Sequence, residues 1–348
     1  MGSGRAYRSE PISPGLPSGQ KRAARRGRLP IVGAALLGTA VAIWFGLATV
    51  GAWRVAFPDA LYTRPNHGGP PPDWTTHPEL ADPRAAFGAD FQNLMIARRD
   101  GLKLAAWWIP ASKPAGIVIM HGAGNNRHDV LPFAKFIHAA GYPVIALDEI
   151  DHGDSDDAGW GVGYGWRQRD DVLAAVAELR ARGLRQIGAL GFSQGAAAAI
   201  FAEAESNGSL AAIVSDSAYA NLGAMMRQMP SIAGLNPLFA DTIFFESGFW
   251  IGASPDRIAP AQAAGHLGGC ALMVIHGAAD TVVPVANAQA IYAAAHGDKE
   301  LWHKEIWIVP KADHIVAFEN EPDEYSRRVT GFFDRYLLAA PGGATTRP

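Results

Sequence analysis

A serine with a glycine two positions away on each side, in residues 191–195, is the pattern with the clearest chemistry in this chain. The short apolar run 186–190 precedes it, as a buried strand would, and a run of alanines follows it, as a helix packed closely on a sheet would. A sharp turn from strand to helix leaves no room for side chains at Gly191 and Gly195. The pattern therefore predicts that Ser193 is a nucleophile presented on such a turn.

A serine nucleophile needs a base, and the base needs a carboxylate that orients it. On a strand-turn-helix scaffold the three follow in the order Ser, Asp, His. Asp280 follows the apolar run 271–275, at the strand end where open α/β sheets build their sites. His314 follows the strand-like run 301–309 and is the only histidine after it. We therefore expect a triad of Ser193, Asp280 and His314.

Other residues near these positions could take the same roles. Asp216 follows the strand after the serine's helix, and some folds of this type draw their acid from there, but we favour Asp280. Asp313 adjoins His314, and we expect its side chain to point away from the imidazole. His276 precedes Asp280 in an Ile-His-Gly turn, and we expect it to pack structurally rather than act as the base.

The negative charge that develops on an attacked carbonyl needs two N–H donors. One should be the backbone N–H of Gln194, directly after the serine, and the other should come from the loop after the third strand, near residues 116–120. In that loop Gly122 allows a close approach of the backbone, and Ala123 is the expected donor. His121 is expected to brace the loop by hydrogen bonding.

Elements that position these residues alternate along the chain. After an opening hairpin near residues 91–109, strand-like runs near 116–120, 143–148, 186–191, 211–215, 271–275 and 302–309 alternate with helical patterns near 128–140, 167–182, 194–205, 285–296 and 323–338. This alternation predicts an α/β fold with a mostly parallel, doubly wound sheet.

Together these motifs resemble the α/β-hydrolase superfamily, and are similar to its exported or membrane-anchored esterase, lipase and serine-peptidase-like members. The resemblance spans about residues 90–338 and includes a His-Gly-x-x-x-Asn oxyanion loop. It departs at Phe192, where many relatives carry histidine, and at residues 150–153, which replace an arginine-containing loop after the fourth strand. The resemblance implies an α/β-hydrolase sheet, an acyl-enzyme on Ser193, and neither a cofactor nor a metal.

Residues 217–269 interrupt the alternation and are expected to form a helical cap over the site. Met225, Met226 and Phe245 lie in this apolar segment, and flexible side chains of this kind adapt to varied acyl or aromatic groups. The same residues would also serve to pack the cap onto the core. The expected partner is thus a small-molecule or lipid-like acyl substrate.

Charge and cysteine content exclude other classes of function. Residues 1–28 hold seven basic residues and one acidic residue, a net charge of +6, and the rest of the chain carries −9. The folded part is therefore not basic enough to indicate a nucleic-acid partner. Cys270, the single cysteine, precludes an intrachain disulfide and is expected to be a buried thiol. Four aspartates at 151, 154, 156 and 157 are expected to form a solvated loop rather than a metal site.

The N-terminus has a separate organisation. Residues 29–53 carry no charge over 25 positions, which is long enough for a transmembrane signal anchor. Basic residues cluster in 1–28, which predicts a disordered cytoplasmic tail and a catalytic domain on the non-cytoplasmic side. Residues 54–89 read as a Pro/Gly-rich spacer, and 90–340 as the hydrolase domain. Small residues near the end of the apolar run leave cleavage open, and cleavage would give a secreted protein.

The sequence therefore predicts a serine hydrolase that cleaves an ester or related acyl bond through an acyl-enzyme. A serine peptidase or a thioesterase of the same fold remains an alternative. A non-catalytic binding protein on this fold is another, although such proteins usually lose a member of the triad.

Overall fold

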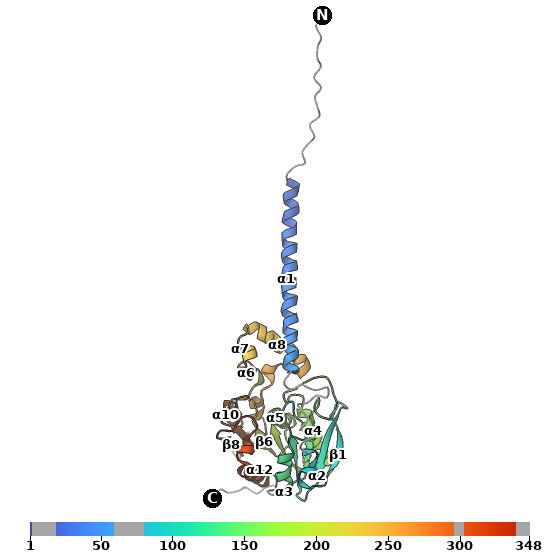
Figure 1. Cartoon of the computed structure of the whole chain (residues 1–348), viewed down its shortest axis with the longest axis vertical. Helices are drawn as coiled ribbons and strands as arrows, with labels where there is room; N and C mark the ends of the chain where they lie inside the picture. The colour runs from blue at the N-terminus through green and yellow to red at the C-terminus, as the bar shows by residue number, and fades with distance from the viewer. Residues whose placement is uncertain (2–18, 59–79, 296–302, 339–348) are drawn as a thin grey trace. The chain divides into compact units, whose positions relative to one another are not determined.

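The fold is built on a single sheet, of which Figure 1 labels strands β1, β6 and β8. Its eight strands follow the order β1-β2-β4-β3-β5-β6-β7-β8. The structure is a computed structural model that describes residues 1, 19–58, 80–295 and 303–338, with only the backbone described for 19–30. β1 and β2 pair antiparallel, as do β2 and β4, and all other pairs are parallel. The strands are β1 (Gln92–Ala97), β2 (Lys103–Ile109), β3 (Ala115–Met120), β4 (Val144–Leu147), β5 (Gln186–Phe192), β6 (Ala212–Asp216), β7 (Ala271–Gly277) and β8 (Lys304–Val309).

Helices cover both faces of the sheet, because side chains alternate along the central strands and both faces are apolar. One buried cluster joins the sheet to α4 (Arg169–Ala181), α5 (Gln194–Ser206) and α10 (Ala286–Ala294). A second joins the other face to α3 (Leu131–Ala139) and α12 (Pro322–Leu337). The predicted α/β fold with a mostly parallel, doubly wound sheet is confirmed.

The register of the parallel strands brings their carboxyl ends to one edge. Met120 lies opposite Gly191, Phe192 opposite Asp216, and Asp216 opposite Ile275. The loops after β3, β5, β6 and β7 therefore start from neighbouring points. This is the edge where the expected catalytic residues lie.

A helical insertion separates β6 from β7, as the sequence predicts for a cap. It contains α6 (Leu222–Met226), α7 (Pro230–Ala233), α8 (Pro237–Ile251), the 3-10 helix η2 (Pro255–Arg257) and α9 (Pro260–Ala264). Prolines at the starts of α7, α8, η2 and α9 suit the first turn of a helix, where a backbone N–H has no intrahelical partner.

The chain divides into two compact units, Met1–Leu47 and Ala48–Pro348. Helix α1 (Gly19–Ala56) belongs to both, and its stretch Ile31–Ala56 is long and apolar enough to cross a membrane by length and composition alone. The helix begins before the predicted span, so residues 19–28 are helical rather than disordered. Lysine, arginine and alanine are good helix formers, which accounts for this extension.

Other expectations for the N-terminal region fall partly outside the described residues. Residues 2–18 of the tail and 59–79 of the spacer are not described. Helix α1 continues through Ala56, past the expected end of the span at Trp53. Within the expected spacer, residues 83–87 form the short helix α2 (Pro83–Phe87), capped by the side chain of Asp82.

Candidate active site

Ser193 occupies the turn between β5 and α5. Its backbone has φ 49° and ψ −106°, a conformation that is rare for residues other than glycine. The Ser193 N–H donates to the carbonyl of Asp216, and its carbonyl accepts from Ala197 N–H, so the turn is held on both sides. Strain of this kind persists only where the surrounding structure fixes the backbone.

The glycines around Ser193 are required by close contacts between backbones. A Cβ at Gly191 would lie 2.4 Å from the carbonyl oxygen of Gly195, and a Cβ at Gly195 would lie 2.5 Å from that of His121. A Cβ at Gly122 would lie 3.8 Å from Ser193 Cβ and 3.3 Å from Ile315 Cδ1. The loop after β3 thus lies directly beside both Ser193 and the segment that follows β8.

Asp280 and His314 meet across the loops that follow β7 and β8. His314 Nδ1 lies 2.8 Å from Asp280 Oδ2, and the other carboxylate oxygen accepts from the N–H groups of Val282 and Val283 at 2.9 and 2.7 Å. Burial alone would raise the pKa of Asp280, but hydrogen bonds from His276, His314 and Val283 hold it below its usual range. The carboxylate is therefore charged and fixed against the imidazole.

His276 braces the Asp280 loop. Its fully buried Nε2 lies 2.7 Å from the carbonyl of Val283 and 3.2 Å from Asp280 Oδ2. The imidazole thus joins the end of strand β7 to the loop that carries the Asp280 carboxylate. This position agrees with the structural role expected for His276.

The two alternative carboxylates are engaged elsewhere. Asp216 accepts from the hydroxyls of Tyr325 and Ser217, each at 2.8 Å, and burial raises its pKa to about 6. Asp313 accepts from the N–H groups of Thr281 and His314. Asp313 therefore ties the β7 and β8 loops together through the backbone, while Asp280 alone bonds the His314 ring within the described residues.

Two backbone N–H groups beside Ser193 remain available as donors. In the described part of the chain, no hydrogen bond uses the N–H of Ala123 or of Gln194. The neighbouring N–H of Gly124 donates instead to His152 Nε2, and that of Asn125 donates to the Gly122 carbonyl. The loop is thus held in place by groups other than the two expected donors.

Two buried histidines hold the loop after β3. His121 Nδ1 lies 2.7 Å from the Gly122 carbonyl, and its Nε2 accepts from Glu149 N–H at 2.9 Å, while burial lowers its pKa to about 4. His152 joins Gly124 N–H to the carbonyl of Ile150. Residues 150–153 therefore support the loop after β3 through His152, a role that the sequence did not indicate.

Glu149 lies behind the residue that follows Ser193. Its fully buried carboxyl accepts a hydrogen bond from the side-chain amide of Gln194, and its other oxygen has no partner among the described residues. Burial, with a contribution from nearby Asp171, raises the pKa of Glu149 well above its usual value. Burial at this place therefore favours the neutral form of the carboxyl over the charged form.

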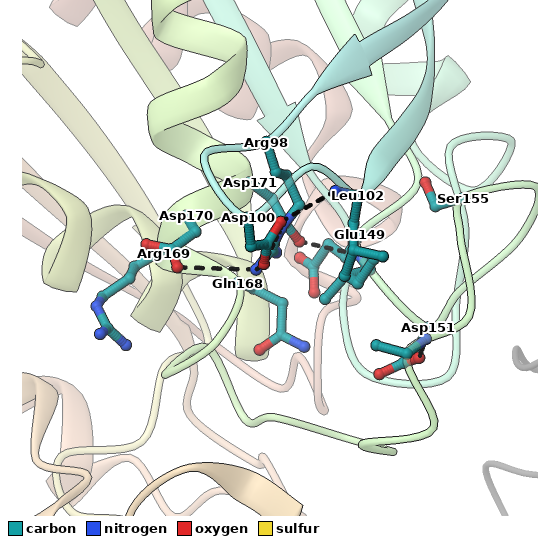
Figure 2. Close-up of polar contacts among 12 residues, drawn as sticks. Arg98, Asp100, Leu102, Glu149, Asp151, Ser155, Gln168, Arg169, Asp170 and Asp171 are labelled. Atoms are coloured by element: carbon teal, nitrogen blue, oxygen red, sulfur yellow. Dashed lines mark hydrogen bonds and ion pairs between the residues drawn. The ribbon is translucent and has the colours of Figure 1, made fainter.

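A buried ion-pair network supports the loop that carries Glu149 (Figure 2). Arg98 pairs with Asp171 at the start of α4 and lies 2.8 Å from Asp100. The second oxygen of Asp171 accepts from Ile150 N–H at 2.9 Å. The network therefore connects the β1–β2 hairpin and α4 to the backbone next to Glu149.

Of the four aspartates expected in a solvated loop, Asp154 and Asp157 are exposed and Asp156 is half-buried, but Asp151 is not solvated. Asp151 is buried, and its carboxylate accepts from the N–H groups of Ala158 and Gly159. Asp148, also buried, pairs with Arg127, whose guanidinium also bonds Asp154 at 2.6 Å. The described residues contain no group of three or more metal-ligating side chains. These carboxylates instead fold the loop, because buried N–H groups and Arg127 need acceptors.

The cap residues expected at the substrate do not all lie together. Met225 and Met226 are buried in a cluster that also contains Val283, the residue whose N–H binds Asp280. Phe245 is 67% exposed on α8 and contacts the ring of Phe249 edge-on. The two methionines therefore lie toward the loop that carries Asp280, while Phe245 faces outward and does not fit the expected acyl pocket.

Comparison with known proteins places the fold of this chain among α/β hydrolases. A family model described as the prolyl oligopeptidase family matches residues 160–339. The uncharacterized protein YfhR of Escherichia coli O157:H7 is 25% identical over 263 residues, which cover 72% of this chain and 81% of YfhR.

Solved structures of esterases share the fold. Esterase Pf2001 of Pyrococcus furiosus superposes with a TM-score of 0.60 and 25% identity, covering 79% of this chain and 98% of the esterase. Est1E of Butyrivibrio proteoclasticus, solved with ferulic acid bound, gives a TM-score of 0.57 at 17% identity, covering 71% and 100% of the two chains. At that identity the second likeness concerns the fold alone.

Proposed function

The chain belongs to the prolyl oligopeptidase family of the α/β-hydrolase superfamily, and from this premise we propose that it cleaves carboxylic esters through a Ser193–His314–Asp280 triad. The family match and the α/β-hydrolase fold support a serine hydrolase. The observation that carries the proposal is the 2.8 Å hydrogen bond between His314 and the buried Asp280, on loops that leave the same edge of the sheet as the strained turn at Ser193.

The proposed chemistry proceeds in two halves. Ser193 Oγ attacks the acyl carbonyl carbon while His314 Nε2 takes its proton, and the carboxylate of Asp280 stabilises the imidazolium through Nδ1–H. The N–H groups of Ala123 and Gln194 bind the oxyanion. His314 then gives the proton to the leaving alcohol, which departs and leaves an acyl group on Ser193. Water, activated by His314, releases the acid and restores the serine.

We also propose that α1 anchors the enzyme in a membrane, because Ile31–Ala56 has the length and hydropathy of a span. The basic residues of 1–28 favour a cytoplasmic N-terminus and a catalytic domain on the other side. Cleavage after the apolar run would instead release a secreted enzyme.

A serine peptidase is the second candidate, and the observation in its favour is the family match itself. The fold likeness to esterases favours ester cleavage. The deciding experiment measures kcat/KM of the purified chain for p-nitrophenyl esters, acyl thioesters and short peptides, with Ser193→Ala as control. Ester turnover that exceeds peptide and thioester turnover and disappears in Ser193→Ala supports the proposal. Turnover of peptides alone would replace it with the peptidase reading.

A further inference from the structure

Three large apolar side chains lie on one exposed face of the cap helix α8. Leu238, Phe245 and Phe249 are 67%, 67% and 71% exposed, at spacings of seven and four residues that place them on the same side of a helix. The opposite side of α8 is buried through residues such as Ile243 and Phe244. Exposed apolar faces of this kind mark interaction sites.

The buried side of α8 packs against the end of α1, within the unit Ala48–Pro348. A Cβ at Gly51 would lie 2.8 Å from Ile243 Cδ1, so the glycine lets the two helices approach closely. Thr49 donates a hydrogen bond of 2.7 Å to Glu246, which fixes the register between the helices. Nearby on α1, Trp53 remains exposed.

These contacts occur at a defined depth along the apolar run. A membrane span needs about 20 residues, so a span that starts at Ile31 ends near Val50. Thr49 and Gly51, which hold α8, lie at the end of such a span, within an apolar run that continues to Ala56. Side chains attached to this level of the helix would lie at the boundary between lipid and water, where aromatic side chains are enriched.

The charges of α8 are compatible with a lipid surface. Asp241 pairs with Arg227 at 2.7 Å, and Glu246 accepts from Thr49. Arg227 also pairs with Asp256. Each carboxylate of α8 therefore has a partner within the fold, which lowers the cost of moving this helix out of bulk water.

We propose that the outward face of α8, formed by Leu238, Phe245 and Phe249, contacts the interfacial region of the lipid bilayer that α1 spans. The proposal rests on the membrane anchor of the proposed function. It places the cap at the bilayer surface, so the substrate class becomes acyl esters dissolved in the membrane rather than in water.

The first test measures the depth of α8 directly. The full-length Phe249→Cys variant is labelled at the new cysteine with an environment-sensitive fluorophore and placed in phosphatidylcholine vesicles that contain nitroxide-labelled lipid. Met95→Cys, labelled in the same way, is the matched control, because Met95 on β1 is 54% exposed. The native Cys270 is buried, and the unsubstituted chain shows its background labelling. We expect the nitroxide lipid to quench the label at 249 several-fold more than the label at 95.

Three results would overturn the proposal, and they are distinguishable. Washing the vesicles with carbonate tests whether the chain is anchored in the membrane. If the chain stays in the vesicles after this wash but the nitroxide lipid does not quench the label at 249, the anchor stands and the lipid contact is wrong. A label that is shielded from aqueous iodide yet insensitive to nitroxide lipid would identify a second copy or another protein as the partner. If carbonate extracts the chain, the anchor itself fails and the lipid contact fails with it.

A second measurement uses activity. Leu238→Ser combined with Phe249→Ser should lower turnover of a long-chain ester embedded in vesicles several-fold and leave turnover of a water-soluble butyrate ester unchanged. Met95→Ser should change neither. An equal loss for both esters would show that the substitutions damage the cap itself, and unchanged turnover of both would contradict the lipid contact.

Discussion

The side-chain amide of Gln194 donates a hydrogen bond to the buried carboxyl of Glu149. This contact ties the residue after Ser193 to the loop that follows β4. The same loop reaches the oxyanion loop, since Glu149 N–H donates to His121. One buried acid therefore contacts both segments whose N–H groups are proposed to bind the oxyanion.

Glu149→Gln should preserve the fold and increase stability relative to the parent protein as pH rises. Burial raises the pKa of Glu149, so the folded state holds its proton at pH values where the unfolded chain, with a pKa of about 4.3, has lost it. The parent protein therefore loses stability as pH rises above about 4.3 toward the folded-state pKa, and the glutamine variant lacks this loss. Urea unfolding at pH 5 and pH 8 measures the difference.

The control for this prediction is Glu149→Ala, which leaves the Gln194 amide without its partner. A buried group left unsatisfied costs about 1–3 kcal/mol, and the missing side chain adds a cavity cost. A Glu149→Gln variant that loses stability relative to the parent as pH rises would mean that the carboxyl is ionised in the fold.

Asp280→Asn should lower kcat by about four orders of magnitude, because the amide no longer holds His314 in the required tautomer. Asp216→Asn should cost much less activity, since Asp216 contacts Tyr325 and Ser217. Steady-state kinetics at equal stability, checked by thermal melting, compares the two variants. A larger loss of activity in Asp216→Asn than in Asp280→Asn would mean that the triad carboxylate is Asp216, at the end of β6.

Met225→Ala and Met226→Ala should shift preference among soluble esters of different acyl length. Both residues are buried near the Asp280 loop, and one methylene in an apolar pocket changes discrimination by about 1–3 kcal/mol. The measurement is kcat/KM for three acyl lengths together with the melting temperature. An equal loss for all lengths with a lower melting temperature would show that the methionines only pack the cap.

External protease added to spheroplasts should digest the catalytic domain and spare a tag at Met1. The basic residues before the apolar run favour this orientation. Digestion of the tag in intact spheroplasts would reverse the topology. A soluble mature protein that begins near Ala52 would instead demonstrate a cleaved signal.

Local patterns were sufficient to predict the fold and the turn at Ser193. Gly191 and Gly195 are spaced by the geometry of one turn. The strand before Asp280 starts with the apolar run 271–275, and the strand before His314 ends with the apolar run 306–309, so each signal lies within a few residues. The register of the sheet then brings the three loops to one edge. The Ser193 turn and the strands before Asp280 and His314 can therefore be predicted from the spacing of glycines and apolar residues and from the order of the strands along the chain.

The supporting contacts could not be predicted in the same way. Glu149 and Gln194 lie 45 positions apart, and His152 and Gly124 lie 28 apart, so only the folded sheet brings them together. The sequence predicts that Asp151 lies at the surface. In the fold its carboxylate is buried, because it accepts hydrogen bonds from N–H groups of its own loop. The outward orientation of Phe245 likewise depends on which side of α8 meets α1.

The most direct test of the central claim is reaction of the purified chain with a fluorophosphonate, followed by peptide mass spectrometry. The account predicts one covalent adduct on Ser193, absent in a folded Ser193→Ala variant and formed far more slowly in Asp280→Asn. An adduct on another residue, or no adduct on a protein whose fold is intact, would contradict the assignment of Ser193 as the nucleophile.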